Sequence, residues 1–381
     1  MLWRADRPAG ERQAAGIRMI RDLAGLDRLA GVWDSMAEPS GSPTQRFAWV
    51  RACAATFTGL NRLHVVVMDS DAGAGAAAPL IERADGGRHL ELLGAEELGE
   101  PVDVPARDSA SLDRLAETLA RSSRPLLLRR VPAGSPVVGA VQRAYRRRGV
   151  VICRPTTGSL WIPLRAGWVQ PEDLLDAGRL TDVSRARRAA EGMGGMRHEV
   201  LSPQPADLGP LLDQAWQVET AGRTGGHGSG DPLRGRFFRR YAEAACRDGM
   251  LRLAFLRIGG RPAAMQLAVE CGERFWLLKI GCDEQFARCS PGSLLMLETL
   301  RYAAARGLRS YELPGSPEPW TKMWTPLTRQ CVSVRAYPTT EPGLSGLVMD
   351  LAKRAGRRAI APAALEQGVA ALVANGLATA R

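Results

Sequence analysis

Apolar and polar residues alternate along residues 251–258, and two mainly apolar runs follow at residues 262–270 and 275–280. A period of two is typical of strands that bury one face. Gly259–Gly260 and Gly272–Glu273 separate the three runs, and glycine at such places favours tight turns. The pattern therefore predicts three consecutive strands joined by hairpins.

The period changes after these strands. Leu294, Leu295, Leu297 and Leu300 are spaced as on a helix, and a Ser-Pro-Gly-Ser turn precedes them. A short run at residues 310–313 predicts one more strand, and residues 320–324 are expected to form a loop that carries a lysine.

The first part of the chain mixes both periods over residues 17–165, as expected of a mixed α/β domain. Strand-like runs cover residues 62–68, 76–81, 126–131 and 150–154, and helical runs cover residues 26–37, 47–57, 112–121 and 137–148. Gly167, Trp168 and Pro171 mark a boundary, and helical patterns follow at residues 182–193, 207–220 and 232–246. The fold class expected is α/β (α+β), with domains at residues 1–165 and 166–343 and a helical tail at residues 344–381.

The turn before Leu294 has the features of an anion site. Gly292 and Ser293 place backbone amides at a helix start, where the helix dipole favours negative charge. Ser290 belongs to the same turn, and Arg288 can add a bidentate contact. A Ser-Pro-Gly turn is also common as plain punctuation before a helix, so both interpretations stay open.

Lysine is scarce in this chain, which has three lysines and 48 arginines. Two of the three, Lys279 and Lys322, lie in the part that carries the hairpins and the turn. A compact ammonium contacts a carbonyl or phosphate in a way that a planar guanidinium does not. Chance placement is the alternative.

Three carboxylates are candidates for proton transfer or substrate orientation. Glu219 ends a helical run just before the glycine-rich residues 225–230, and a carboxylate there can accept a proton from an attacking amine. A solvated surface acid is the alternative. Asp283 and Glu312 flank the predicted turns, where either can orient a substrate.

This order of elements resembles the acyl-CoA N-acyltransferase (GNAT) fold, and more closely its CelD-type and FemAB-like branch. Residues 251–308 and the motif Gly-Ser-Pro-Glu-Pro-Trp-Thr-Lys-Met-Trp at residues 315–324 carry the most specific match. Residues 32–57, 76–83 and 180–193 resemble the opening helix pair, the first hairpin and the basic helix of the branch. The resemblance implies two GNAT-like halves with mixed, mainly antiparallel sheets flanked by helices.

The resemblance also implies roles for particular residues. Glu219 and Lys322 would be catalytic, and acyl-CoA, such as acetyl-CoA, would be the donor, without a metal. Donor contacts would come from Arg288, Ser290, Gly292 and Ser293, and substrate contacts from Arg185, Arg188, Asp283, Glu312 and Trp320. One departure is clear: Pro291 stands where the GNAT phosphate loop has its first glycine.

Charge and composition limit the partners. The net charge of +11 suits an anion such as a nucleotide, CoA, a transfer RNA or a membrane surface, although compositional bias toward arginine explains it equally well. Seven cysteines without a Cys-x-x-Cys pair and four dispersed histidines argue against a disulfide framework and a zinc site. No apolar stretch approaches the ~20 residues of a membrane helix. The charged N-terminus predicts a cytoplasmic protein.

Three functions remain as hypotheses. The first is an N-acyltransferase that acts on an amine of a small molecule or of a cell-envelope, polysaccharide or secondary-metabolite precursor. The second is an aminoacyl-tRNA-dependent transferase of FemAB type, and the third is a non-catalytic accessory protein of polysaccharide biosynthesis. Peripheral association with a membrane stays open, and no DNA partner is expected.

Overall fold

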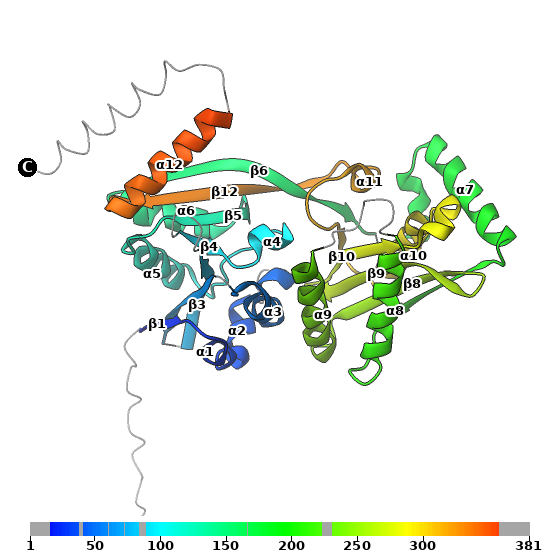
Figure 1. Ribbon diagram of the computed structural model, residues 1–381, viewed down its shortest axis with the longest axis horizontal. Helices are drawn as coiled ribbons and strands as arrows, with labels where there is room; N and C mark the ends of the chain where they lie inside the picture. The colour runs from blue at the N-terminus through cyan, green and yellow to red at the C-terminus, as the bar shows by residue number, and fades with distance from the viewer. Residues whose placement is uncertain are drawn as a thin grey trace, which may run out of the picture.

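The computed structural model describes residues 16–37, 41–59, 61–71, 73–83, 89–165, 167–222 and 231–357 (Figure 1). The α-helices are α1 (Leu23–Asp27), α2 (Ala30–Ala37), α3 (Phe47–Phe57), α4 (Ala95–Leu98), α5 (Ser109–Ala120), α6 (Pro136–Tyr145), α7 (Ala177–Gly192), α8 (Leu208–Ala221), α9 (Pro232–Arg247), α10 (Pro291–Ala305), α11 (Pro319–Lys322) and α12 (Glu341–Arg357). Short 3-10 helices are η2 (Pro43–Gln45), η3 (Pro171–Leu174) and η4 (Glu284–Cys289).

The strands form a 12-stranded sheet in the order β1-β2-β3-β4-β5-β12-β6-β11-β10-β9-β8-β7. They are β1 (Ile17–Ile20), β2 (Arg62–Ser70), β3 (Gly73–Glu82), β4 (Leu90–Leu92), β5 (Leu126–Pro132), β6 (Gly149–Pro163), β7 (Met196–Leu201), β8 (Leu251–Ile258), β9 (Arg261–Cys271), β10 (Arg274–Cys282), β11 (Ser310–Glu312) and β12 (Thr328–Pro338). Among the described pairs, β4–β5 and β10–β11 are parallel and the others are antiparallel. The predicted α/β class with a mixed, mainly antiparallel sheet is confirmed.

Strand β6 joins the two halves of this sheet, the N-terminal group β1–β5 with β12 and the C-terminal group β7–β11. Its residues 149–160 pair with β12, and its last three residues, 161–163, pair with β11. Figure 1 shows β6 running from the N-terminal group of strands toward α11. Strand β12 comes late in the chain and yet lies between β5 and β6. The division of the chain into domains at residues 165 and 343 therefore stays a prediction, while the sheet pairing places β12 with the earlier strands.

Helices α3 and α9 pack the two groups of strands together. The Trp49 ring of α3 meets the rings of Phe237 and Tyr241 of α9 at centroid distances of 4.8 and 4.9 Å, edge to face. All three side chains are buried in one core cluster that also contains residues of β2 and β8. Each such aromatic pair contributes about 0.5–1.5 kcal/mol beyond the area it buries.

A pair of glycines makes a second contact between the two groups. Gly41 and Gly272 have φ angles of +60° and +57°, and a Cβ built on Gly272 would lie 2.4 Å from the Gly41 Cα. Any side chain at Gly272 would therefore separate the two backbones. Within the described ranges, the helices are too short or too polar to cross a membrane.

Candidate functional site

The parallel strands β10 and β11 pair over three residues only. Arg274, Phe275 and Trp276 face Ser310, Tyr311 and Glu312. β11 then ends, whereas β10 continues to Cys282 with β9 as its remaining partner among the described strands. A register shift between Leu277 and Lys279 marks a bulge in β10. A bulge turns side chains in a new direction, and such bulges are common beside active sites.

Lys279 at this bulge binds Glu219. The Lys279 Nζ lies 2.8 Å from the Glu219 Oε1, and the side chains are only 12% and 17% exposed. The Lys279 ammonium also lies 5.1 Å from the centroid of the Phe238 ring on α9, a distance that gives a cation–π attraction. The pair thus joins the last turn of α8 to β10. The sequence singled out each residue but did not predict that they form a pair.

Two glycines let α8 approach β10 closely. A Cβ built on Gly222 would lie 2.1 Å from the Cys282 carbonyl oxygen, and one on Gly281 would lie 3.0 Å from the Glu219 Cα. Larger residues at either position would push the end of α8 away from the strand. The position of Glu219 over Lys279 therefore depends on both glycines.

Helix α10 begins beside the same end of β10. Ser290 is its N-cap residue, in a left-handed conformation with φ 40° and ψ 54°, and makes no side-chain capping bond. Pro291 has no N–H, and the Ser293 N–H donates to the Ser290 carbonyl oxygen at 3.0 Å. The predicted helix start is thus confirmed, with Ser293 in the first turn.

The Gly292 amide faces a thiol. Its N–H donates to the Cys282 sulfur; burial raises the pKa of that thiol to about 11, and the hydrogen bond opposes the shift. A Cβ on Gly292 would lie 2.8 Å from the sulfur, so this position has no room for a side chain. Cys282 is held as a neutral thiol at neutral pH and is therefore a poor nucleophile.

The other predicted carboxylates are bound within the protein. Glu312 is 2% exposed, and Arg329 donates to both of its oxygens at 2.8 and 2.7 Å. Asp283 caps η4 by accepting the Gln285 N–H at 2.9 Å. Trp320 donates its indole N–H to Glu318 at 2.8 Å. These contacts position the ends of β11, η4 and α11.

The predicted cations lie on the surface. Lys322, Arg288 and Arg188 are exposed, and no side-chain hydrogen bond or ion pair ties them to other residues in the described part of the chain. Arg185 pairs with Asp182 at 3.0 Å, with both side chains about two-thirds exposed. The Arg179 guanidinium binds the Met323 carbonyl oxygen at 2.7 Å and joins α7 to the region of Lys322. The glycine-rich residues 225–230 lie outside the described residues.

Hydrogen bonds from Glu100 and Arg130 hold the loop at residues 313–318, and the sequence did not predict them. The Gly315 N–H donates to the Glu100 carboxylate at 2.8 Å, and the Gly315 carbonyl oxygen accepts from Arg130 at 3.0 Å. Arg130 also donates to Ser159 at 2.9 Å and to Ser316 at 3.3 Å. The N-terminal strands therefore hold the loop that leads to Lys322. No sequence motif marks Glu100 or Arg130.

Burial decides the protonation of Glu100. It raises the pKa of this carboxyl to about 7, although Arg130, the Gly315 N–H and Arg234 favour the charged form. Arg130 has a φ of 50°, which is uncommon outside glycine. Its guanidinium donates to the carbonyl oxygens of Gly158 and Gly315.

Residues 177–322 match a family model described as an acetyltransferase (GNAT) domain. The crystal structure of FemX is similar in fold, with a TM-score of 0.55 and 11% identity over 87% of this chain and 99% of that one. The C-terminal domain of a protein described as a lysylphosphatidylglycerol synthetase from Agrobacterium fabrum has a TM-score of 0.52 and 11% identity, over 88% and 97% of the two chains. No curated protein sequence matches the chain.

A third structure, a conserved protein of unknown function from Bacteroides thetaiotaomicron, has a TM-score of 0.52 and 12% identity over 84% of this chain and 99% of that one. At these identities the similarity shows the fold alone. The matched segment holds α7 to α11 and therefore the Lys279–Glu219 pair and the start of α10. Residues 177–322 thus match a GNAT acetyltransferase domain, and the chain as a whole shares the fold of FemX.

Proposed function

We propose that the protein transfers an acyl group from acyl-CoA to a primary amine of a cell-envelope, polysaccharide or secondary-metabolite precursor in the cytoplasm. The observation that carries this proposal is the meeting of three elements at the end of β10. They are the bulge with Lys279, the last turn of α8 with Glu219, and the first turn of α10.

The reaction needs little covalent chemistry from the protein. The amine nitrogen attacks the thioester carbonyl carbon, the new C–N bond forms, and the C–S bond breaks as the thiolate of CoA leaves. The excess proton of the amine passes to Glu219, directly or through water, and the thiolate takes up a proton from solvent. Placement of the two substrates within reacting distance supplies much of the rate.

Lys279 has a positioning role in this proposal. Its ammonium holds the Glu219 carboxylate at 2.8 Å over the bulge, and so fixes the base relative to the strand. A base must lie within hydrogen-bonding reach of the proton that it removes. The scarcity of lysine in the chain agrees with a need for a compact cation at this position.

The donor side is proposed at the start of α10. The helix dipole favours an anion at this end, Arg288 is exposed beside it, and the Ser290 side chain makes no capping hydrogen bond, whereas the Ser293 N–H is already donated to the Ser290 carbonyl oxygen. Gly292 contributes by its close fit against Cys282. Lys322, with Arg185 and Arg188 on α7, is proposed to face the acceptor, while Asp283, Glu312 and Trp320 hold the surrounding turns.

Thermal unfolding with acetyl-CoA, longer acyl-CoAs and charged tRNA tests the donor. A ligand that binds only the native state stabilises it by about 2.7 kcal/mol at 100 times its Kd, so the true donor raises Tm. Arg288→Gln should reduce the shift. Arg147→Gln, which changes an exposed arginine two residues after the end of α6, should not. Stabilisation by charged tRNA alone would instead favour the aminoacyl-tRNA-dependent reaction, and no shift with any donor would contradict both.

A further inference from the structure

One face of the N-terminal strands is left open. Strands β5, β12 and β6 bury their other face against α5 and α6, in a core that contains Leu128, Val334 and Ala336. On the open face a cavity of about 870 Å³ lies between α4 and α12. Its size is in the range of small-molecule sites, which measure roughly 300–1,000 Å³. We call it the N-terminal groove.

Strand alternation makes the floor of this groove basic. Along β12, Ser333, Arg335 and Tyr337 point to the groove, while Val334 and Ala336 point to the core. Arg154 of β6 lies opposite Ser333 in the register, and Arg335 lies opposite Leu127 of β5. Arginines therefore reach the groove from neighbouring strands whose spacing is about 4.8 Å.

The lining carries an excess of positive charge. Arg129, Arg130, Arg154 and Arg335 line the groove together with two carboxylates, Glu96 and Asp350. Arg335 pairs with Asp350 of α12. Arg154 is exposed and forms no ion pair or side-chain hydrogen bond with the residues that the structure describes. The groove thus has a cation that is available for a ligand.

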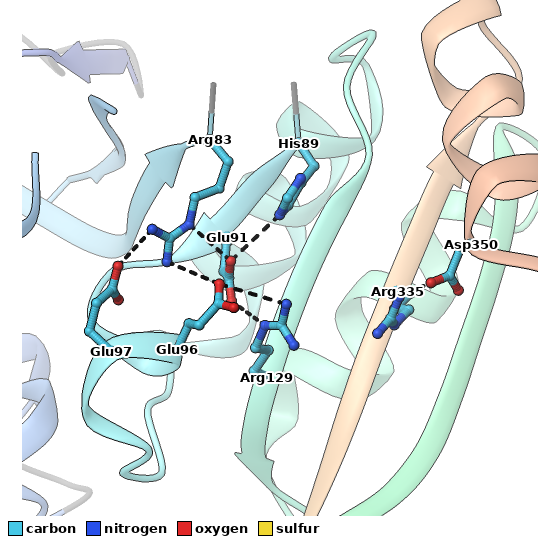
Figure 2. A network of polar contacts seen from close by, with 8 residues as sticks. All are labelled: Arg83, His89, Glu91, Glu96, Glu97, Arg129, Arg335 and Asp350. Atoms are coloured by element: carbon cyan, nitrogen blue, oxygen red, sulfur yellow. Dashed lines mark hydrogen bonds and ion pairs between the residues drawn. The ribbon is translucent and has the colours of Figure 1, made fainter. Parts of the chain in front are cut away.

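A buried charge network fixes one wall (Figure 2). Glu91 is fully buried and binds Arg129, Arg83 at 3.2 Å and His89 at 3.5 Å. Burial alone would raise the pKa of Glu91, but His89, Arg129 and Arg83 together lower it. Arg83 in turn binds Glu97 at 2.6 Å. The network holds the Arg129 guanidinium in place before any ligand arrives.

Such preorganisation lowers the cost of binding, because fixed side chains lose little entropy when a ligand binds. A planar guanidinium contacts a phosphate or carboxylate with two parallel hydrogen bonds. Leu126, Leu127, Ile152 and Met349 add apolar surface along the same groove. The lining therefore suits a small molecule that has two or more acidic groups and an apolar portion.

We propose that the N-terminal groove binds a small polyanion, with Arg154 and Arg335 as the residues that contact its acidic groups. The site lies outside residues 177–322 and does not use the residues assigned to acyl transfer. It therefore stands whether or not the proposed donor is correct.

Isothermal titration calorimetry of the whole protein at low salt tests the groove, with inorganic pyrophosphate and citrate as probes. At least one probe should bind saturably at one site. The probe that binds more tightly shows whether the groove prefers phosphate or carboxylate groups. Arg154→Gln should weaken that binding roughly 10- to 100-fold, as expected for loss of a charge-assisted contact. Because Arg154 is exposed, its variant should keep the wild-type Tm.

Two matched arginine variants complete the test. Arg147→Gln, exposed on another surface, and Arg288→Gln, beside α10, should both bind the probe as wild type does. The proposal is overturned if neither probe binds, or if Arg154→Gln binds as tightly as wild type. It is also overturned if Arg288→Gln weakens binding as much, because the probe would then occupy the start of α10.

Discussion

The two parallel strand pairs of this molecule have the same connection but different contents. β4 and β5 pair at Leu90–Leu126 and Glu91–Leu127 and are joined through α4 and α5, and β10 and β11 are joined through η4 and α10. In the first pair, the Asp108 carboxylate caps α5 by accepting the Ser111 N–H at 2.7 Å. In the second, α10 starts at Ser290 without a side-chain cap.

The charged side chains beside the two strand pairs also differ. Beside β4, the Glu91 carboxylate is shared by Arg83, His89 and Arg129, and the charges satisfy one another. Beside β10, one ammonium and one carboxylate, Lys279 and Glu219, form a partly exposed pair. An acidic cap repels a phosphate, whereas an uncapped helix start attracts one. The same topology therefore carries a structural network in one place and, in our proposal, a donor site in the other, so function has to be argued from side chains.

Glu219→Gln should give the largest effect on this comparison. If Glu219 accepts the proton of the amine, turnover should fall roughly 100- to 10,000-fold, as expected when a general base is lost. Release of free CoA with a primary amine acceptor measures it, and the free energy of unfolding in urea serves as control. Turnover within a few-fold of wild type would leave the pair with a structural role, like the Glu91 network.

Lys322→Met extends the comparison to the loop after β11. If its ammonium contacts the acceptor or the oxyanion, turnover should fall roughly 100- to 1,000-fold. Lys322→Arg should restore little, because the guanidinium differs in shape and hydration. Tm should not change, since Lys322 is exposed. Full activity in both variants would remove Lys322 from the acyl-transfer site.

Glu91→Gln, beside β4, should lower stability, whereas the substitutions beside β10 and β11 should lower turnover. Removal of a buried carboxylate leaves Arg83 and Arg129 with less compensation, at a cost of about 3–5 kcal/mol in the free energy of unfolding. Urea unfolding measures this loss. Glu117→Gln, which breaks the exposed pair with Arg121, is the matched control and should leave stability unchanged. An equal loss in both variants would mean that the buried network has no special role.

Glu100 should make stability depend on pH. Its pKa is about 7 in the folded protein against an ordinary 4.5, so the folded state holds the proton more tightly than the unfolded chain. Its contribution is complete below pH 4.5 and is lost as the pH rises through 7, by about 3 kcal/mol in total.

Comparison of wild type with Glu100→Gln isolates this effect. Urea unfolding between pH 4 and 8 should show the wild type losing stability relative to the variant as the pH rises. Parallel curves for the two proteins would show that Glu100 titrates normally. The control is Asp213→Asn, since Asp213 pairs with Arg239 on the surface, and its curve should run parallel to that of the wild type.

The local elements could be predicted from the sequence wherever the residue pattern alone decides them. Helix α3 has the predicted bounds, and the three hairpin strands and α10 lie where period and turns placed them. The predicted helix at residues 26–37 is instead two short helices, α1 and α2. Strand β6 is far longer than the predicted residues 150–154, because it is extended by pairing with β12 and β11.

Contacts between distant residues explain what was missed. Strands β1, β4, β7 and β12 were not predicted, and the place of β12 depends on a β5 partner about 200 residues away. Lys279 was singled out by its rarity and Glu219 by its position, but only the fold brings them to 2.8 Å. No sequence pattern marks Glu100 or Arg130, because both act by binding the backbone of Gly315, which is distant in the sequence.

The place of β12 has a consequence for synthesis on the ribosome. Its Val332 pairs with Val131 and with Pro155, so β5 and β6 both wait for a strand that is made roughly 200 residues later. At ~5–20 residues per second, that wait lasts about 10 to 40 s. Throughout it, two strands keep unpaired edges of the kind that attract other chains. The first half of the nascent protein can therefore complete its sheet only after β12 has left the ribosome.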